Sequence, residues 1–461
     1  MPFSLIDETD GAVPIIALTQ DQLPGWLDKS APCERNWLTS TGFSAESGKH
    51  ALAPGETGKL ARVLVGLGAG ADAERGMWAL AGLPAALPEA SYRLEAAPDG
   101  ADPSRLALGW ALATYVFTRY SAKSRPTAAL VWPKGADRGR VERLARAVFL
   151  ARDLANTPAG DLGPEELAAA ALRVAKDAGA DHRVIAGDDL LAENYPTIHA
   201  VGRASTRAPR LVDITWGDPA APKVTLVGKG VCFDSGGLDL KTASGMRLMK
   251  KDMAGAAIML GLAQAIMDAR LPVRLRMLLP CVENSVSGNA MRPLDIVRTR
   301  KGITVEIGNT DAEGRLILWD ALAEASTEKP ELLIDMATLT GAARVALGPE
   351  VAALFCDDEG LARDLLATAG AEEDPIWRLP LWRPYRKMID SKVADINNVS
   401  ESPHAGAIIA ALYLQEFVDP GIPWAHLDVM AWNPQSRPGR PEGAEATALR
   451  ALYAHITQWF A

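Results

Sequence analysis

Apolar residues along the chain form short runs that alternate with longer amphipathic stretches. Apolar runs of four to eight residues between polar or glycine residues are typical of strands, and apolar positions three or four residues apart are typical of helices. In the first part of the chain these patterns predict strands at Leu60 to Leu67, Ser91 to Glu95 and Thr127 to Trp132, and a helix over residues 103–121. We therefore expect a small α/β module at the N-terminus.

A basic amphipathic stretch follows this module. Residues 138–155 have helical spacing and end at Asn156-Thr157-Pro158, and Pro164 then suits the first turn of a second helix that reaches about Ala178. The arginines of the first stretch indicate a solvated helix face. We predict a domain boundary here, with an N-terminal domain over residues 1–145 and a C-terminal domain over residues 146–461.

From Val224 onward, strand-type and helix-type runs alternate. The strand-type runs are Val224 to Val227, Val273 to Leu279, Thr304 to Ile307, Leu332 to Met336, Val351 to Phe355 and Trp424 to Asp428. The helix-type runs are Met253 to Met267, Leu316 to Ala325, His404 to Phe417 and Ala444 to Trp459. This alternation predicts an α/β fold with a central mixed, largely parallel sheet covered by helices. Ligands of such sheets bind beyond the carboxyl ends of the strands, where polar clusters follow Val227 and Ile307.

The most unusual polar cluster is residues 309–316, with the sequence NTDAEGRL. One interpretation is a capping box, in which the side chains of Thr310 and Glu313 accept hydrogen bonds from free backbone amides at the start of a helix. That interpretation leaves Asp311 and Arg315 unexplained. Residues two apart share a face of an extended chain but not of a helix. We therefore favour an irregular or extended segment that points Asp311, Glu313 and Arg315 into one cleft.

Composition narrows the class of partner. The chain has 48 Lys and Arg against 57 Asp and Glu, a net charge of −9, so no basic excess is present to neutralise nucleic-acid phosphates. The first ten residues lack the features of a signal peptide, and no apolar run approaches the roughly 18 residues of a membrane span. The four cysteines are far apart in the sequence, which favours reduced thiols. We expect a cytoplasmic protein whose general partner is neither a membrane nor nucleic acid.

The polar clusters contain the residue types of a metal-assisted active site. The candidates are Lys229, Asp234, Lys241, Asp252, Asp311, Glu313 and Arg315. Taken singly, the aspartates suit turns and helix starts, and the lysines suit a solvated surface. Together, the carboxylates favour a pair of divalent cations, either magnesium or manganese or else zinc. Such a pair activates water and polarises a carbonyl, and a lysine or arginine can stabilise the resulting oxyanion. The pattern predicts a metal-assisted hydrolase.

Three motifs resemble the leucyl aminopeptidase (cytosol aminopeptidase) family. They are residues 227–241, VGKGVCFDSGGLDLK; residues 246–253, MRLMKKDM; and residues 309–316. The likeness extends from about Ala151 to near the C-terminus, while the N-terminal region matches only loosely. The resemblance implies a macro-domain-like N-terminal module and a homohexamer with active sites facing an interior cavity. It also implies an aminopeptidase that removes leucine-like and other residues from peptides with a free N-terminus.

The resemblance also implies a role for each matching residue. Asp234 and Glu313 match carboxylates that bridge two metals, which would be zinc or manganese, with magnesium or cobalt as alternatives. Lys229 and Asp252 match ligands of the more exchangeable metal, and Asp311 matches a ligand of the other. A ligating lysine must be neutral, so Lys229 would need a lowered pKa. The remaining matches are Lys241, which polarises the scissile carbonyl; Arg315, which holds a bicarbonate serving as general base; Met249, Thr338 and Gly341, which line the pocket for the N-terminal side chain; and Leu339, whose carbonyl meets substrate.

Three places in the sequence depart from the family pattern. Cys232 replaces a common threonine, residues 238–240 are Leu-Asp-Leu, and Trp319 occupies a helix position that is usually small. A regular strand through Asp234 would put Cys232 on the same side as that ligand, although a buried core thiol is the alternative. None of the three replaces a ligand. Two other functions remain open: a DNA-binding role, as some relatives have, and another two-metal hydrolase such as a phosphoesterase.

Overall fold

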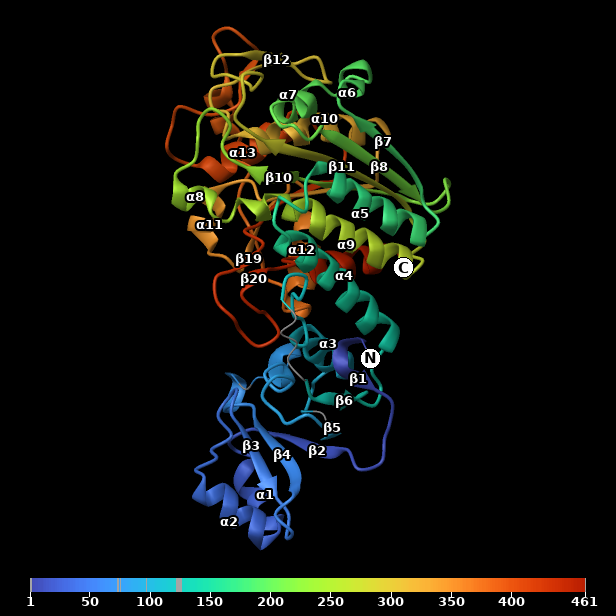
Figure 1. Cartoon of the computed structure of the whole chain (residues 1–461), viewed down its shortest axis with the longest axis vertical. Coiled ribbons are helices and arrows are strands. Elements are labelled where there is room, and N and C mark those ends of the chain that lie inside the picture. The colour runs from blue at the N-terminus through green and yellow to red at the C-terminus, as the bar shows by residue number, and fades with distance from the viewer. Residues whose placement is uncertain (1, 73, 75, 97, 122–126, 461) are drawn as a thin grey trace. The chain divides into compact units, whose positions relative to one another are not determined.

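The computed structural model describes residues 2–72, 74, 76–96, 98–121 and 127–460 (Figure 1). The chain divides into two compact units. The first is Met1–Phe149 with Gln435–Glu442, and the second is Leu150–Pro434 with Gly443–Ala461. Within the described residues, no helix combines the length and apolar character needed to cross a membrane.

The N-terminal unit contains a six-stranded sheet in the order β1-β6-β5-β2-β4-β3. Its strands are β1 Leu5–Ile6, β2 Val13–Leu18, β3 His50–Pro54, β4 Leu60–Gly66, β5 Ser91–Ala96 and β6 Ala129–Val131. All neighbours are parallel except β3 and β4. The three predicted strands are confirmed as β4, β5 and β6. The patterns missed β2, which lies inside the sheet although Pro14 argues against a central strand.

The predicted helix over residues 103–121 is shorter in the structure, where α3 spans Pro103–Ala113. It begins conventionally, because Asp102 accepts a hydrogen bond from the Ser104 amide at 2.8 Å. Beyond its end, residues 114–118 are β-branched or aromatic and have low helix propensity. This unit also contains α1 Leu23–Lys29, α2 Pro32–Ser40, residues 138–149 of the helix α4 (Arg138–Asn156), and the 3₁₀ segments η1 Pro2–Ser4, η2 Gly70–Asp72 and η3 Met77–Leu80.

The second unit contains a nine-stranded mixed sheet, in the order β16-β15-β18-β14-β9-β11-β8-β7 with β10 paired to β11. The strands are β7 Asp181–Ala186, β8 Arg210–Trp216, β9 Lys223–Gly228, β10 Gly230–Asp234, β11 Arg274–Asn284, β14 Leu332–Ala337, β15 Ala352–Phe355, β16 Ile376–Arg378 and β18 Trp424–Asp428. β18, β14, β9, β11 and β10 run parallel, and the pairs β15–β18 and β8–β11 are antiparallel. The predicted mixed, largely parallel sheet is confirmed.

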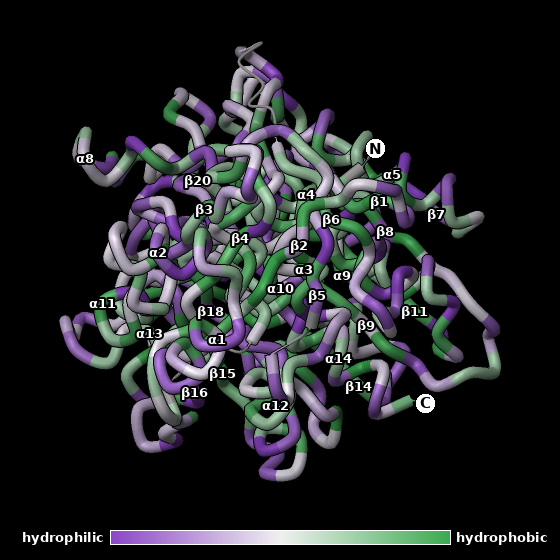
Figure 2. The backbone as a smooth tube through the Cα atoms, turned by 90° about the horizontal axis from the view of Figure 1, so that it is seen from below, coloured by the Kyte–Doolittle hydropathy of each residue, from purple (hydrophilic) through white to green (hydrophobic). Residues whose placement is uncertain are grey.

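Helices cover both faces of this sheet. Figure 1 shows α5 (Pro164–Asp177) and α9 (Ala254–Asp268) on one side of the strands, and α7 (Pro196–Gly202) and α10 (Glu313–Thr327) on the other. Further helices are α4 Arg138–Asn156, α6 Asp189–Ala192, α8 Ala243–Met246, α11 Gly341–Leu347, α12 Glu359–Ala371, α13 Gly406–Gln415, α14 Leu449–Trp459, η4 Met249–Met253 and η5 Arg383–Ile389. The tube in Figure 2 is mainly green along α9, as its apolar sequence requires.

Two predicted helices begin later than their apolar patterns indicated. The helix predicted from His404 begins at Gly406, and the one predicted from Ala444 begins at Leu449. Gly443 and Ala444 instead form β20, paired with β19 (Trp432–Asn433). A remaining three-stranded sheet is formed by β12 Ile296–Arg298, β13 Thr304–Glu306 and β17 Ile396–Asn397, and β13 comes shortly before the 309–316 segment.

Trp319, which we expected to be large for its helix position, lies in the core where α10 packs against α13. Its side chain is fully buried and stacks on Phe417 with ring centroids 4.6 Å apart. The Tyr413 ring lies 6.0 Å away on the other helix. The core has therefore accommodated the extra volume with aromatic partners, and the indole fixes α10, which carries part of the polar cluster.

Trp319→Ala should destabilise the second unit by about 3–5 kcal/mol, because it removes a buried aromatic and leaves a cavity. Thermal unfolding followed by circular dichroism measures the effect. Trp377→Ala is the matched control, since that indole is 62% exposed and should change the unfolding temperature little. Equal shifts for the two variants would contradict this role for Trp319.

Candidate functional site

The polar residues of the second unit meet at the carboxyl ends of its parallel strands. Lys229 follows β9 directly, Asp234 is the last residue of β10, and Thr338 follows β14. The backbone of Lys229 is fixed on both sides, because its amide donates to the Met336 carbonyl at 3.0 Å and its carbonyl accepts from the Ala256 amide at 2.9 Å. These strand ends open into a cavity of about 760 Å³.

The 309–316 segment enters this cavity, but not as a capping box. Helix α10 begins at Glu313 and has no side-chain cap at its N-terminus. Thr310 turns away from the helix, and its hydroxyl donates to the Gly236 carbonyl at 2.6 Å. The capping-box interpretation is therefore wrong. Asp311 lies in a turn before the helix and Arg315 in the first helical turn, so the expected extended segment stops earlier than we predicted, yet the Asp, Glu and Arg all line the cavity.

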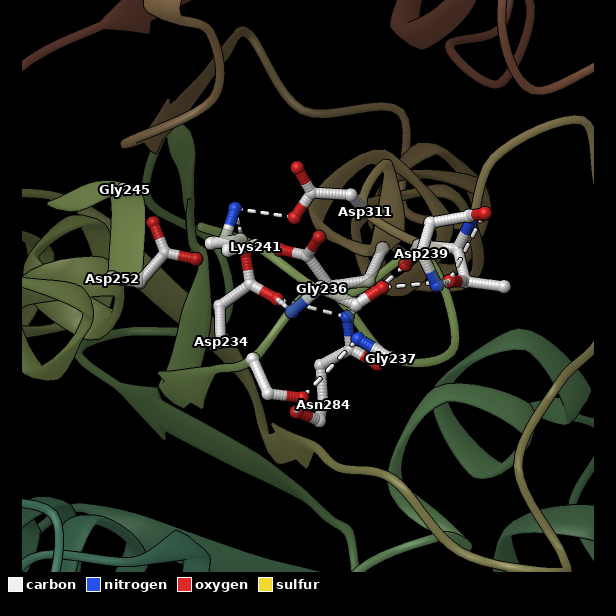
Figure 3. Close-up of polar contacts among 12 residues, drawn as sticks. Asp234, Gly236, Gly237, Asp239, Lys241, Gly245, Asp252, Asn284 and Asp311 are labelled. Atoms are coloured by element: carbon white, nitrogen blue, oxygen red, sulfur yellow. Dashed lines mark hydrogen bonds and ion pairs between the residues drawn. The ribbon is translucent and has the colours of Figure 1, made fainter. Parts of the chain in front are cut away.

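Two residues to which the sequence assigned no role in the site position this segment. Asp239 accepts a hydrogen bond from the Thr310 amide at 2.7 Å, and Asn284 donates to the Asp234 carboxylate at 2.8 Å and to the Thr310 carbonyl at 3.1 Å (Figure 3). Gly236 makes the intervening turn with φ of +90°, where a Cβ would lie 2.5 Å from the Asp239 carbonyl oxygen. The Asp239–Thr310 contacts join two motifs that are 71 residues apart in the chain.

One lysine-centred network is fully buried. Lys229 Nζ lies 2.7 Å from Asp252 Oδ2, 3.0 Å from Glu313 Oε1 and 2.9 Å from the Thr338 carbonyl. The Glu313 contact does not have the angle of a hydrogen bond, so this buried oxygen lacks a donor. Gly314 makes the approach feasible, because a Cβ there would lie 2.4 Å from Lys229 Cε.

A second network surrounds Lys241. Its ammonium group lies 2.7 Å from Asp234 Oδ2 and also forms an ion pair with Asp311, as Figure 3 shows. The other oxygen of Asp234 accepts from the Gly236 amide at 2.9 Å. Lys241 thus occupies the space between two carboxylates and acts there as a stand-in cation.

The electrostatics of the cluster are those of a site short of positive charge. Burial and then Asp252 raise the pKa of Asp234 to about 6, and burial and then Asp234 raise the pKa of Glu313 to about 8. Burial disfavours the ammonium form of Lys229, but the surrounding carboxylates outweigh burial and raise its pKa. The lowered pKa that a metal-ligating Lys229 needs would therefore require metal cations beside the amine, which would displace its proton. Four carboxylates share only two lysines, so additional cations fit the donor set.

Three of these carboxylates form a compact group. Asp234, Asp252 and Glu313 are buried, and one oxygen of each lies within 4.8 Å of the others. Carboxylate oxygens at such spacing suit divalent cations, and the Glu313 oxygen that accepts no hydrogen bond is the kind of ligand atom that a cation satisfies. The residues present therefore fit a metal site.

Arg315 lies beside this group and faces no carboxylate partner among the described residues. Its Nη1 donates to the Asn398 carbonyl at 2.7 Å, its guanidinium lies 4.9 Å from the centre of the Tyr413 ring, and its Nε is buried without a hydrogen-bond partner. Burial lowers its pKa without discharging the group. A half-buried guanidinium whose buried Nε has a free N–H is suited to hold an anion.

The residues expected to contact substrate also reach the cavity. Met249, Thr338, Leu339 and Gly341 all line it. The Thr338 hydroxyl donates to Asp252 Oδ1 at 2.7 Å, which couples this wall to the carboxylate group. Cys232 is buried, does not line the cavity, and has a pKa that burial raises well above its ordinary value. A register shift in β10 between Val231 and Asp234 breaks the regular alternation, so Cys232 is a core thiol.

Comparisons with known proteins agree with this geometry. Residues 149–453 match the catalytic domain of the cytosol aminopeptidase family, and residues 13–133 match the M17 aminopeptidase N-terminal domain. The chain belongs to the cytosol aminopeptidase family. A relative named "Probable cytosol aminopeptidase" from Syntrophotalea carbinolica is 38% identical over 98% of this chain and 95% of its own.

Solved structures extend the similarity to the whole fold of the family. The cytosol aminopeptidase from Coxiella burnetii is 48% identical and superimposes with a TM-score of 0.95, over 99% of this chain and 100% of its own. The bottromycin maturation enzyme BotP, solved in complex with Mn, is 35% identical with a TM-score of 0.88, over 97% and 99% of the two chains. Family membership supports hydrolysis of peptides as an aminopeptidase.

The raised pKa of Glu313 predicts how the metal-free protein responds to pH. Its folded value of about 8 exceeds its ordinary value of 4.5, so the folded state binds more protons, and this group costs stability as pH rises through that window. Glu313→Gln removes the cost. In buffer that contains a metal chelator, the unfolding temperature of Glu313→Gln should therefore fall less between about pH 5 and pH 8 than that of the unsubstituted protein. If the unfolding temperatures of the two proteins change equally with pH, the raised pKa of Glu313 is contradicted.

Proposed function

We propose that the protein is an aminopeptidase that removes N-terminal residues, leucine-like and others, from peptides by two-metal-assisted hydrolysis. The observation that carries the proposal is the buried group of Asp234, Asp252 and Glu313 at the strand ends, with oxygens within 4.8 Å of one another. The manganese in the related BotP structure supports a divalent cation in this family. Zinc or manganese best suits these ligands, and magnesium or cobalt would also be accepted.

The ligands divide between two cations. Asp234 and Glu313 would bridge them, Lys229 and Asp252 would hold the more exchangeable one, and Asp311 the other. The short contacts of Lys229 and Lys241 with these carboxylates support this division, because each ammonium group lies where its carboxylates converge. When bound, two such cations supply an activated water and a polarised scissile carbonyl.

Three further features of the chain would complete the reaction. Lys241, released from Asp234 and Asp311, would donate to the oxyanion that forms from the scissile carbonyl. Arg315 would hold a bicarbonate as general base, and its unpartnered Nε and the absence of a histidine among the residues that line the described cavity support this role. The Leu339 carbonyl would orient the substrate main chain.

The remaining parts of the proposal concern substrate, assembly and location. The substrates would be peptides with a free N-terminal amine, because the amine must reach the cations, and Met249, Thr338 and Gly341 would surround the first side chain. We include a homohexamer, because the sequence motifs resemble a hexameric family. The names of the relatives support a cytoplasmic location.

Glu313→Gln tests the proposal directly. It should lower kcat on leucyl p-nitroanilide by at least about 100-fold in saturating manganese, because it removes a bridging carboxylate while keeping the side-chain shape. Glu359→Gln is the matched control, since Glu359 pairs with Arg378 at the surface of α12 and should keep full activity. Near-normal turnover of the metal-loaded Glu313→Gln protein would refute the proposal. A parallel assay with a phosphomonoester tests the phosphoesterase alternative, which predicts the opposite substrate choice.

A further inference from the structure

Two cations in the cavity belong to no network described so far. Lys251 and Arg344 both line it, and no hydrogen bond or ion pair of either side chain is found among the described residues. Lys251 is only 6% exposed. An ammonium group buried to this degree without a partner costs free energy, so its presence calls for a ligand that the chain itself does not supply.

The carboxylates nearest to these cations are already engaged. Asp252, the next residue after Lys251, contacts Lys229 and the Thr338 hydroxyl. Asp428 accepts from the Leu339 and Thr340 amides at 2.9 and 3.2 Å and from the Thr340 hydroxyl at 2.6 Å. Neither acid lies within ion-pair distance of Lys251 or Arg344. Asp252 and Asp428 therefore favour the charged form of Lys251 only through space, and neither Lys251 nor Arg344 has a side-chain contact partner among the described residues.

The position of the two cations determines what they would meet. Lys251 follows Met249 by two residues in η4, and Arg344 lies one helical turn after Gly341 in α11 with its guanidinium beside that glycine. A substrate whose amine and scissile carbonyl lie at the carboxylate group places its first side chain within one side-chain length of the group. Lys251 lines the same cavity as that group and as Met249 and Gly341, so a first side chain in this cavity can reach it.

The geometry points to a cationic pocket for an acidic N-terminal residue, in which Lys251 and Arg344 bind the side-chain carboxylate of Asp or Glu. This inference rests on the proposed aminopeptidase function and adds its substrate class. Lys251 would be a specificity-determining residue that contacts substrate, and the more exposed Arg344 would contribute less. A leucine side chain in the same place would leave the buried ammonium unpaired and would bind more weakly.

Aminoacyl p-nitroanilides test the inference, because they carry no C-terminal carboxylate that could bind the same cations. With manganese-loaded protein, kcat/KM should be higher for the α-glutamyl or α-aspartyl anilide than for the leucyl anilide. Lys251→Met should lower kcat/KM for the acidic anilides by about 10- to 100-fold, the usual value of a hydrogen bond to a charged group, with little change for the leucyl anilide. Lys251→Glu should shift the preference towards lysyl or arginyl anilides.

Lys250→Met is the matched control for the Lys251 variants. Lys250 is the adjacent lysine, but its Nζ donates to the Asn156 carbonyl at 2.6 Å and lies 5.5 Å from the centre of the Trp432 ring, and it does not line the cavity. Its substitution should leave the ratio of acidic to leucyl activity unchanged. Arg344→Leu, at an exposed surface position, tests the pocket independently if Lys251→Met does not fold.

The outcomes separate this inference from the proposed function. If the protein hydrolyses none of the anilides in the presence of zinc, manganese, magnesium or cobalt, the proposed function is overturned. Efficient leucyl hydrolysis, with an acidic-to-leucyl ratio that Lys251→Met and Arg344→Leu leave unchanged, would overturn the acidic pocket alone. If the two variants lose activity on the dipeptide Leu-Gly but not on leucyl-glycinamide, Lys251 and Arg344 bind the C-terminal carboxylate of the substrate. That result would also overturn the acidic pocket.

Discussion

The burial of several carboxylates at one edge of a sheet is the constraint on which the rest of the site depends. Asp234, Asp252 and Glu313 are each at most 3% exposed, and negative charge at such depth is stable only beside positive charge. In the protein without metals, Lys229 and Lys241 supply that charge. Their short contacts with the carboxylates mark where metal cations fit. The same carboxylates can therefore either pair with the lysines or bind metal cations.

The fold supplies this constraint through the parallel centre of the sheet. β14 lies beside β9, and β10 continues the line of β9 along β11; each of the three contributes a residue of the cluster at or just after its last position. Burial by helices on both faces keeps water from most of the cluster, which is why Glu313 has a raised pKa while Asp252, beside two lysines, has a lowered one. The same elements that stabilise the second unit thus set its chemistry.

Much of this arrangement was predictable from the sequence, because the informative signals are local. Strand periodicity and the position of polar residues after strands predicted the sheet and the edge where the candidates meet. The alternate charges of residues 309–316 predicted that Asp311, Glu313 and Arg315 converge, although helix α10 begins at Glu313 and the extended segment ends sooner.

The misses involve contacts that are distant in sequence. Asp239 and Asn284 look like ordinary turn and strand-end residues, and their role follows only from the meeting of two segments. Pro14 hid a central strand, since local rules exclude proline there. In the sequence, Lys251 could not be distinguished from the adjacent Lys250. In the structure, Lys250 bonds to a backbone carbonyl and lies beside the Trp432 ring, whereas Lys251 lines the cavity without a side-chain hydrogen bond or ion pair among the described residues.

The central claim is that this carboxylate cluster binds a pair of divalent cations in place of its lysine contacts. Crystals soaked in manganese and measured at the manganese absorption edge test it most directly. The account predicts two anomalous peaks among the oxygens of Asp234, Asp252, Asp311 and Glu313, with Lys241 no longer bridging Asp234 and Asp311. Peaks confined to surface acids, with both lysine networks intact in saturating metal, would contradict it.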